Sequence, residues 1–210
     1  MSYFLNHKTI ISGILAGMAI SLGAAVNLSV DNRYLGAALF SIGLFCVCSF
    51  GWKLFTGQVC RVMSNREVVY ELLDVWLGNL IGVCVSSPLI LSANPSIYVA
   101  AQALWEAKTN TDLFILFFGG FCCNVLIYIA VEGYRRIDNA LGKYLAILLG
   151  VMVFILCSFE HSVTDMAYFF FAGCFAPLRS ILMILIVSLG NFSSGITISY
   201  FDKEVTKNEQ

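Results

Sequence analysis

The sequence predicts an all-α membrane protein whose six transmembrane helices form two inverted repeats of three helices each. First, 59% of the 210 residues are hydrophobic and only 12% are charged, whereas a soluble globular chain is nearer half apolar and a quarter charged. Second, apolar runs close to the length of a spanning helix, about 20 residues, recur between short polar turns. Third, both halves carry similar motifs in the same order. Residues 1–210 are interpreted as one transmembrane domain within a lipid bilayer.

The first half contains three apolar runs, at residues 9–30, 35–50 and 75–91. The second run leads into residues 51–58, where glycine, lysine and other polar residues interrupt the apolar pattern. This second helix is therefore predicted to be broken inside the membrane. Asn94-Pro95 closes the third run, as is typical of a helix end.

The second half repeats this plan, with apolar runs at residues 113–131, 144–159 and 181–201. The fifth run meets Glu160-His161-Ser162 in mid-membrane and resumes to about residue 175, so the fifth helix is also predicted to be broken. The tail, residues 202–210, is polar and predicted to fray.

The loop charges predict the orientation of the chain. With the N-terminus in the cytoplasm, three basic residues fall outside and eight fall inside, namely Lys8, Arg61, Arg66, Arg135, Arg136, Lys143, Lys203 and Lys207. Because cytoplasmic loops are enriched in Lys and Arg, both termini are predicted to be cytoplasmic in a multi-pass cell-membrane protein. No cleavable signal peptide is expected, since residues 1–9 are polar and no small-residue cleavage site follows.

Two corresponding pairs of motifs indicate an internal repeat, at about residues 9–91 and 111–201. A broken segment precedes a Gly-Asn segment in each half, with the motifs Leu54-Phe55-Thr56-Gly57 and Gly78-Asn79 in the first, and Phe159-Glu160-His161-Ser162 and Gly190-Asn191 in the second. Inverted repeats with paired broken helices are typical of transport proteins with a central site. The alternative is chance, because Leu-Gly-Asn is short.

The two predicted breaks favour a pathway for an anion. Irregular backbone at bilayer depth is tolerated where it is buried in protein or lines a cavity. The helices that resume after Thr56-Gly57 and after His161-Ser162 direct their N-termini toward the middle of the membrane. Helix N-termini carry partial positive charge and free N–H donors.

Glu160 and His161 are ionisable residues at predicted mid-membrane depth, where such residues are usually functional. His161 can donate a proton or a hydrogen bond near neutral pH; the alternative is a structural histidine that caps the loop. Glu160 is expected to accept hydrogen bonds from loop N–H groups, away from the permeating solute. The Thr56 hydroxyl can face the pathway, cap the following half-helix, or do both.

Other functional classes have little support in the sequence. The motifs of zinc peptidases, P-loop proteins, serine hydrolases and dinucleotide-binding domains are absent, so no enzyme activity, cofactor or metal site is expected. Net charge is −1, without a basic cluster that would favour nucleic acid. Two alternatives stay open: a neutral-solute channel like the aquaporins, although their paired Asn-Pro-Ala loops are missing, and a membrane protein that transports nothing.

The motifs in their order resemble the formate/nitrite transporter family over roughly residues 13–200. The match rests on Gly36-Ala37-Ala38-Leu39-Phe40 with Gly43-Leu44, Leu54-Phe55-Thr56-Gly57, Gly78-Asn79, Phe159-Glu160-His161-Ser162 with Met166, and Leu189-Gly190-Asn191. This resemblance implies an aquaporin-like six-helix fold and a homopentamer with one pathway in each protomer. It also implies transport of a small monovalent anion, formate or nitrite before hydrosulfide or lactate, together with a proton in several members.

The resemblance assigns roles to individual residues. The family's central histidine, loop threonine, histidine-contacting asparagine and vestibule lysine correspond to His161, Thr56, Asn124 and Lys108. Its hydrophobic constrictions correspond to Leu54 and Phe154, with further narrowings at Phe40, Leu44 and Phe55, and its loop-structural residues to Glu160, Gly57, Asn79 and Asn191. Without the resemblance, Phe40 and Phe154 would be interpreted as packing residues, and Lys108 as a solvated loop charge.

The chain departs from the family pattern at several positions. Gln58 replaces the usual asparagine after Thr-Gly, and Asp165 replaces the usual asparagine before Met166, which could add a negative charge near the pathway. Lys53 lies beside the first break and either attracts anions or extends to the membrane surface. The amphipathic N-terminal segment is reduced to about residues 1–8, which puts gating by that segment in doubt.

Overall fold

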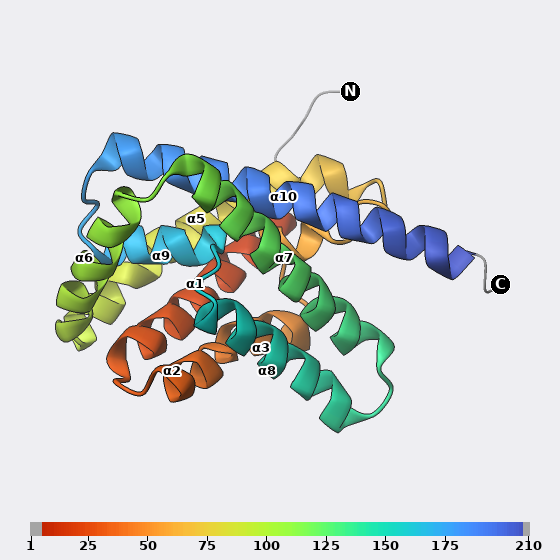
Figure 1. The fold of residues 1–210 in the computed structure, drawn as a ribbon, viewed down its shortest axis with the longest axis horizontal. Helices are drawn as coiled ribbons and strands as arrows, with labels where there is room; N and C mark the ends of the chain where they lie inside the picture. Colours follow the sequence, from red (N-terminus) through yellow and green to blue (C-terminus); the bar gives the residue numbers. More distant parts are fainter. Residues whose placement is uncertain (1–5, 208–210) are drawn as a thin grey trace.

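The computed structural model describes residues 6–207, and this part of the chain forms α-helices without any strand (Figure 1). The predicted all-α fold class is therefore confirmed. The helices are α1 (His7–Ser29), α2 (Arg33–Phe40), α3 (Ile42–Phe50), α4 (Phe55–Val59), α5 (Val68–Ala93), α6 (Ser96–Thr109), α7 (Leu113–Arg136), α8 (Ala140–Leu156), α9 (Ser162–Phe171) and α10 (Pro177–Lys207).

Several helices are long and apolar enough to cross a bilayer. By length and composition these are α1, the combined α2–α3 segment, α5, α7 and α10, while α8 is apolar but shorter. Large apolar side chains are exposed on the outer surface, for example Leu22, Leu89, Phe114 and Leu149. A bilayer would cover such a surface, and the chain is a multi-pass membrane protein. The number of six spans stays a prediction.

Two long helix pairs form the frame of the bundle, α1 against α5 and α7 against α10. Glycines allow the close approach of these helices. A Cβ atom on Gly17 would lie 2.2 Å from the Asn79 carbonyl oxygen, and one on Gly190 would lie 2.2 Å from the Phe117 carbonyl oxygen. Small residues at helix crossings are the usual way for membrane helices to pack closely.

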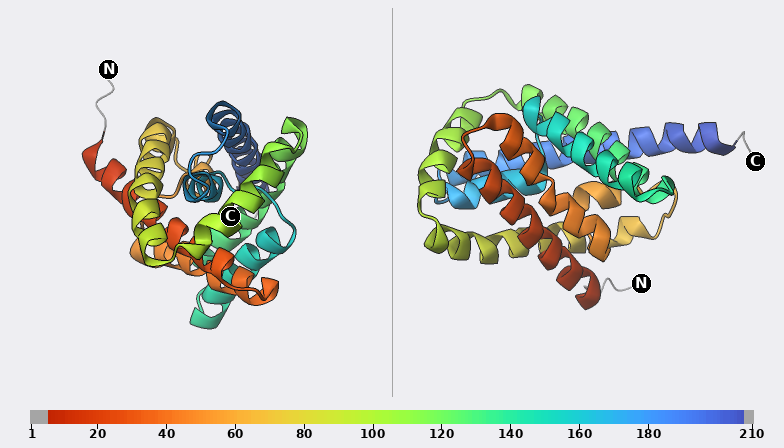
Figure 2. Two further views of the ribbon diagram at one scale, coloured as in Figure 1. Left: turned by 90° about the vertical axis from the view of Figure 1, so that its left-hand side faces the viewer. Right: turned by 90° about the horizontal axis from the view of Figure 1, so that it is seen from below.

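The short helices α4 and α9 lie inside this frame. α9 packs against α1, α5, α6 and α10, and α4 packs against α5, α7 and α10. The view along the bundle shows α9 end-on between the longer helices (Figure 2, left). The described ends of α1 and α10 lie toward the same end of the bundle (Figure 2, right).

The segments that lead into α4 and α9 have the same backbone shape. Each begins with a residue of left-handed conformation, Gly51 (φ 69°) and Ser158 (φ 55°). The next N–H group then bonds back to the preceding helix, from Trp52 to the Val47 carbonyl (3.0 Å) and from Phe159 to the Phe154 carbonyl (2.9 Å). A left-handed serine is uncommon, so tertiary contacts must stabilise the second segment.

Asn79 stabilises the first interruption from inside α5. Its Oδ1 accepts a hydrogen bond from the Phe55 N–H (2.9 Å), the first residue of α4. Its Nδ2 donates to the carbonyls of Gly13 (2.8 Å) and Lys53 (3.0 Å). The fully buried side chain thus satisfies backbone groups that have no water to bind at this depth.

Asn191 makes the equivalent bonds in the second half. Its Oδ1 accepts from the Ser162 N–H (3.0 Å), the first residue of α9. Its Nδ2 donates to the carbonyls of Gly120 (2.7 Å) and Glu160 (3.0 Å). The matched bonds of Asn79 and Asn191 support an internal repeat, and its bounds at residues 9–91 and 111–201 stay a prediction.

The ends of the chain and the segment before α7 differ from the expectation or lie outside the described residues. Residues 202–207 belong to α10 rather than to a frayed tail, because Asp202 pairs with Arg136 of α7 and Lys203 donates to the Met63 carbonyl (2.8 Å). Lys108, which without the resemblance would be interpreted as a solvated loop charge, lies in α6. The predicted short N-terminal segment lies mostly outside the described residues, as do residues 208–210.

Candidate functional site

A buried polar pair joins the two interrupted segments at the centre of the bundle. The Thr56 Oγ1 atom of α4 lies 2.9 Å from the His161 Nε2 atom, directly before α9. Thr56 has no exposed surface and His161 is 2% exposed. The structure thus brings together the residues to which the sequence assigns the central histidine and the loop threonine.

The second nitrogen of His161 caps α9. Its Nδ1 accepts a hydrogen bond from the Thr164 N–H (3.2 Å), and the Thr164 hydroxyl lies 3.0 Å away. A backbone N–H can only donate, so the neutral ring carries its proton on Nε2 and donates it to Thr56 Oγ1. The Thr56 hydroxyl hydrogen is then free to bind a third group. His161 therefore caps α9 through Nδ1 and orients the Thr56 hydroxyl through Nε2.

Apolar side chains enclose the Thr56–His161 pair. The Phe154 ring stacks on the His161 ring with centroids 5.7 Å apart, and meets the Phe40 ring edge-on at 5.8 Å. On the other side, Leu54 directly precedes α4 and is 1% exposed. Phe55 and Leu44 are also buried in this core. The polar pair consequently lies between two apolar layers.

Two cavities approach this centre from opposite sides. The first, about 360 Å³, reaches Phe154 and His161 and includes Ile115 near the start of α7. The second, about 140 Å³, reaches Leu54 and includes Val131 near the end of α7. The α7 helix places these two residues roughly 24 Å apart at 1.5 Å per residue. The two cavities, together with the enclosed polar pair, outline a path across the bundle.

A cluster of three charged residues lines the first cavity. Lys108 of α6 pairs with Glu160, and its Nζ lies 3.0 Å from Asp165 Oδ1 of α9. Burial alone would lower the pKa of Lys108, but the charges of Asp165 and Glu160 outweigh burial and raise this pKa. The ammonium therefore stays charged, and the cluster has a formal net charge of −1 when both carboxylates are ionised.

This cluster differs from the expected arrangement. Lys108 is not a free vestibule cation, because two carboxylates neutralise it. The Glu160 carboxylate is part of the cavity wall rather than bonded to loop N–H groups. Asp165, the departure from the family pattern, is 3% exposed and supplies the second carboxyl group.

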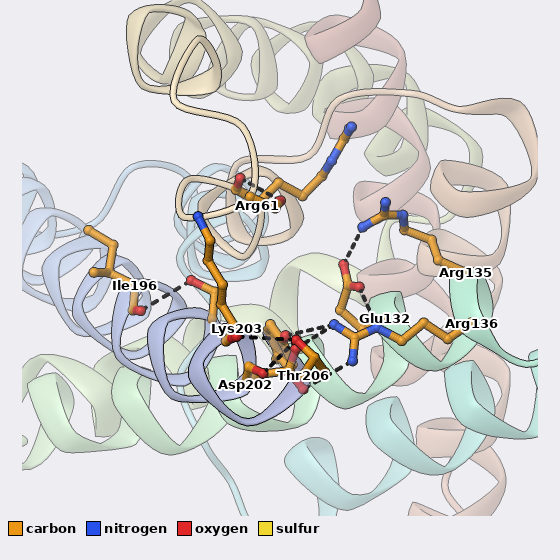
Figure 3. A network of polar contacts seen from close by, with 11 residues as sticks. Arg61, Glu132, Arg135, Arg136, Ile196, Asp202, Lys203 and Thr206 are labelled. Carbon is orange, nitrogen blue, oxygen red and sulfur yellow. Dashed lines mark hydrogen bonds and ion pairs between the residues drawn. The ribbon is translucent and has the colours of Figure 1, made fainter. Parts of the chain in front are cut away.

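The charged residues that line the second cavity are both basic, Arg61 and Arg135, and Gln58 lines it with them. Arg135 pairs with Glu132 (2.6 Å), whereas the Arg61 side chain points away from the neighbouring ion pairs (Figure 3). Lys53 does not line either cavity, because it pairs with Glu71 and donates to the Thr9 hydroxyl (3.1 Å).

Asn124 occupies a different place from the one expected. It was predicted to contact the histidine, but the hydrogen-bond partners of His161 in the described chain are Thr56 and Thr164. The Asn124 Nδ2 instead donates to Cys60 Sγ (3.4 Å), and Cys60 donates to the Thr56 carbonyl (3.2 Å). Asn124 of α7 therefore stabilises the end of α4 through Cys60, and α7 packs against α4.

Sequence reasoning did not assign a role to Thr164 or Arg61. Thr164 could have been found as the third residue after a helix-capping position, where an N–H needs an acceptor. Arg61 was counted only as a loop charge; its spacing of one helical turn from Gln58 is the signal that places both on one face.

Comparison with known proteins finds similar transport proteins. A family profile described as formate/nitrite transporter matches residues 4–201. The chain is 32% identical to the nitrite transporter NirC of Escherichia coli (strain K12) over 75% of its own length, and spans 64% of the length of NirC. It is 31% identical to NirC of Salmonella typhimurium, with 88% of this chain and 76% of that protein covered.

Two solved structures share the fold. A structure described as an FNT family ion channel superposes with a TM-score of 0.80 at 27% identity, over 94% of this chain and 88% of that one. A structure described as a pentameric formate channel with formate bound superposes with a TM-score of 0.82 at 23% identity, over 96% and 97% of the two chains.

Proposed function

The chain belongs to the formate/nitrite transporter family, and on that premise we propose that each protomer passes a small monovalent anion, with formate or nitrite as the first candidates. The observation that carries this proposal is the buried Thr56–His161 pair, enclosed by apolar side chains between two cavities. The relatives named as nitrite transporters support the choice of substrate class.

The proposed mechanism uses each layer of the site. Phe154 and Leu54 remove water from the ion and reject hydrated ions. Thr56 then replaces part of the lost hydration with a hydrogen bond from its hydroxyl, while His161 donates to the Thr56 oxygen and so orients that hydroxyl. Solvent supplies a proton through His161, which takes it up on Nδ1 and passes on its Nε2 proton, so that the anion crosses the apolar layers as the weak acid. A neutral acid avoids most of the cost of moving a charge through an apolar region.

We further propose that the protein is a homopentamer in the cell membrane with both termini cytoplasmic. The pentamer is suggested by the structural neighbour described as pentameric. The orientation is suggested by basic residues near the C-terminal ends of α7 and α10, where Arg135 and Lys203 belong to these helices and Arg61 lines a cavity together with Arg135. Cytoplasmic faces are enriched in such residues.

Uptake into proteoliposomes tests the proposal against its two alternatives. We expect formate or nitrite to enter faster than hydrosulfide, lactate or glycerol, in vesicles shown to contain folded oligomer. Water or glycerol flux without anion flux would favour a neutral-solute channel. The absence of any flux would favour a membrane protein that transports nothing.

The vestibule charge gives a prediction for the variant Asp165→Asn. With both carboxylates ionised, removing one brings the formal net charge of the Lys108 cluster from −1 to zero, and the first cavity repels an approaching anion less. At low ionic strength the half-saturating nitrite concentration should fall about threefold, as expected for one unit charge several ångströms away in a partly aqueous site. The difference between the variant and the parent protein should shrink in about 0.5 M salt, because salt screens the interaction between the cluster and the anion. A half-saturating concentration equal to that of the parent protein in low salt would contradict this electrostatic role.

A further inference from the structure

Arg61 is a partly buried cation without a partner. Its Nε atom is buried and lacks a hydrogen-bond partner, and its side chain makes no ion pair within residues 6–207. The neighbouring basic side chains differ, because Arg135, Arg136 and Lys203 each donate to an oxygen of the protein (Figure 3). A buried donor of this kind is costly to leave unpaired. The geometry therefore indicates an acceptor that does not belong to the chain.

The surroundings of Arg61 indicate where this acceptor would lie. Arg61 lines the second cavity together with Gln58, one helical turn earlier, and with Leu54, the predicted constriction. Gln58 is 8% exposed, and its amide can donate into the same space. The cavity of about 140 Å³ can hold a small ion with some water, since one water molecule takes about 30 Å³ of the liquid.

The charges around this cavity favour an anion. Arg61 and Arg135 contribute two positive charges, and Glu132, the carboxylate that pairs with Arg135, is shared with Arg136. The first cavity has the opposite balance, with two carboxyl groups and one ammonium in the Lys108 cluster. The two mouths of the path are therefore electrostatically unlike.

We infer that Arg61 and Gln58 form an anion-binding subsite next to Leu54, at the face that holds both described helix ends, and that it selects planar anions with two oxygens. The guanidinium group offers parallel N–H donors that match a carboxylate or nitrite in a bidentate manner, whereas a spherical anion or hydrosulfide engages them less well. This inference rests on the proposed function and narrows its substrate class to formate- and nitrite-like ions.

Flux measured separately from each face tests the subsite. Three proteins are compared in membrane vesicles of each orientation: the parent protein, Arg61→Met and the control Arg66→Met. The control removes an exposed charge from the same loop. We expect Arg61→Met to raise the half-saturating nitrite concentration about tenfold from the Arg61 face and to leave the opposite face unchanged. Arg66→Met should behave as the parent protein.

A second variant keeps the test decisive if Arg61→Met fails to assemble. Arg61→Lys retains the charge but loses the planar donor pair, so nitrite affinity from this face should fall while hydrosulfide flux stays unchanged. Parent-like nitrite affinity in both Arg61 variants, or an equal loss in Arg66→Met, would overturn the subsite. The absence of anion flux in the parent protein would instead overturn the proposed function.

Discussion

Replacing Asn191 with leucine should abolish assembly of the protein. The change leaves the Ser162 N–H and the Glu160 carbonyl without their partner, deep within the bundle, and removes a second bond to the Gly120 carbonyl of α7. Each unsatisfied buried group costs about 1–3 kcal/mol, so the two together cost about 2–6 kcal/mol. That loss is a large fraction of the whole stability of a typical domain, about 5–15 kcal/mol. The yield of folded oligomer and its melting temperature in detergent measure the effect.

The structure supplies two comparisons for this experiment. Asn79→Leu should be equally damaging, because Asn79 makes the equivalent bonds to Phe55, Gly13 and Lys53. Asn110→Leu should be nearly neutral, because Asn110 lies in an exposed turn and donates only to the Glu106 carbonyl. An Asn191→Leu protein with the parent melting temperature would contradict the role assigned to this side chain.

Replacing His161 with phenylalanine should remove the proton-dependent part of anion uptake. The new ring can keep the stacking against Phe154, but it lacks the Nε2 donor that faces Thr56. Total flux should fall at least about tenfold through the lost hydrogen bond alone. The proton-stimulated component should vanish entirely, because the group proposed to relay the proton is gone. Initial uptake rates with and without an inward proton gradient measure both effects.

The second histidine of the chain provides the control. His7→Phe lies at the exposed start of α1, far in sequence from the Thr56–His161 pair, and should leave both the rate and its proton dependence unchanged. The His161→Phe variant also loses the acceptor for the Thr164 N–H, which costs about 1 kcal/mol of stability, so the oligomer should be verified first. Unchanged proton-dependent flux in His161→Phe would contradict the proposed relay.

Much of the architecture was predictable because the relevant signals are local. Apolar runs define membrane helices by their length alone, and the interruptions before Phe55 and Ser162 coincide with polar residues in otherwise apolar sequence. The pairing of each interruption with a Gly-Asn segment was also visible, because the same short motif recurs in each half.

The parts that escaped prediction depend on contacts between distant residues. Lys108 lies 52 positions from Glu160 and 57 from Asp165, so its pairing with these carboxylates cannot be predicted from the residues next to it. Asp202 lies 66 positions from Arg136, and this ion pair stabilises a helical end that looked frayed. Arg61 could be distinguished from the other basic residues only in the structure, where Arg135 and Arg136 form ion pairs and the Arg61 Nε atom has no hydrogen-bond partner.

The most direct test of the proposed path is to block it at Leu54 and measure uptake of the anion that the parent protein transports. Leu54→Trp adds bulk beside Thr56, between the two cavities, whereas Leu89→Trp adds the same bulk on the outer surface, where Leu89 is 64% exposed. With equal amounts of folded oligomer, the proposed path predicts that Leu54→Trp vesicles take up no more anion than empty vesicles, while Leu89→Trp retains the parent rate. A parent-like rate in Leu54→Trp would mean that the anion does not pass between Leu54 and Phe154.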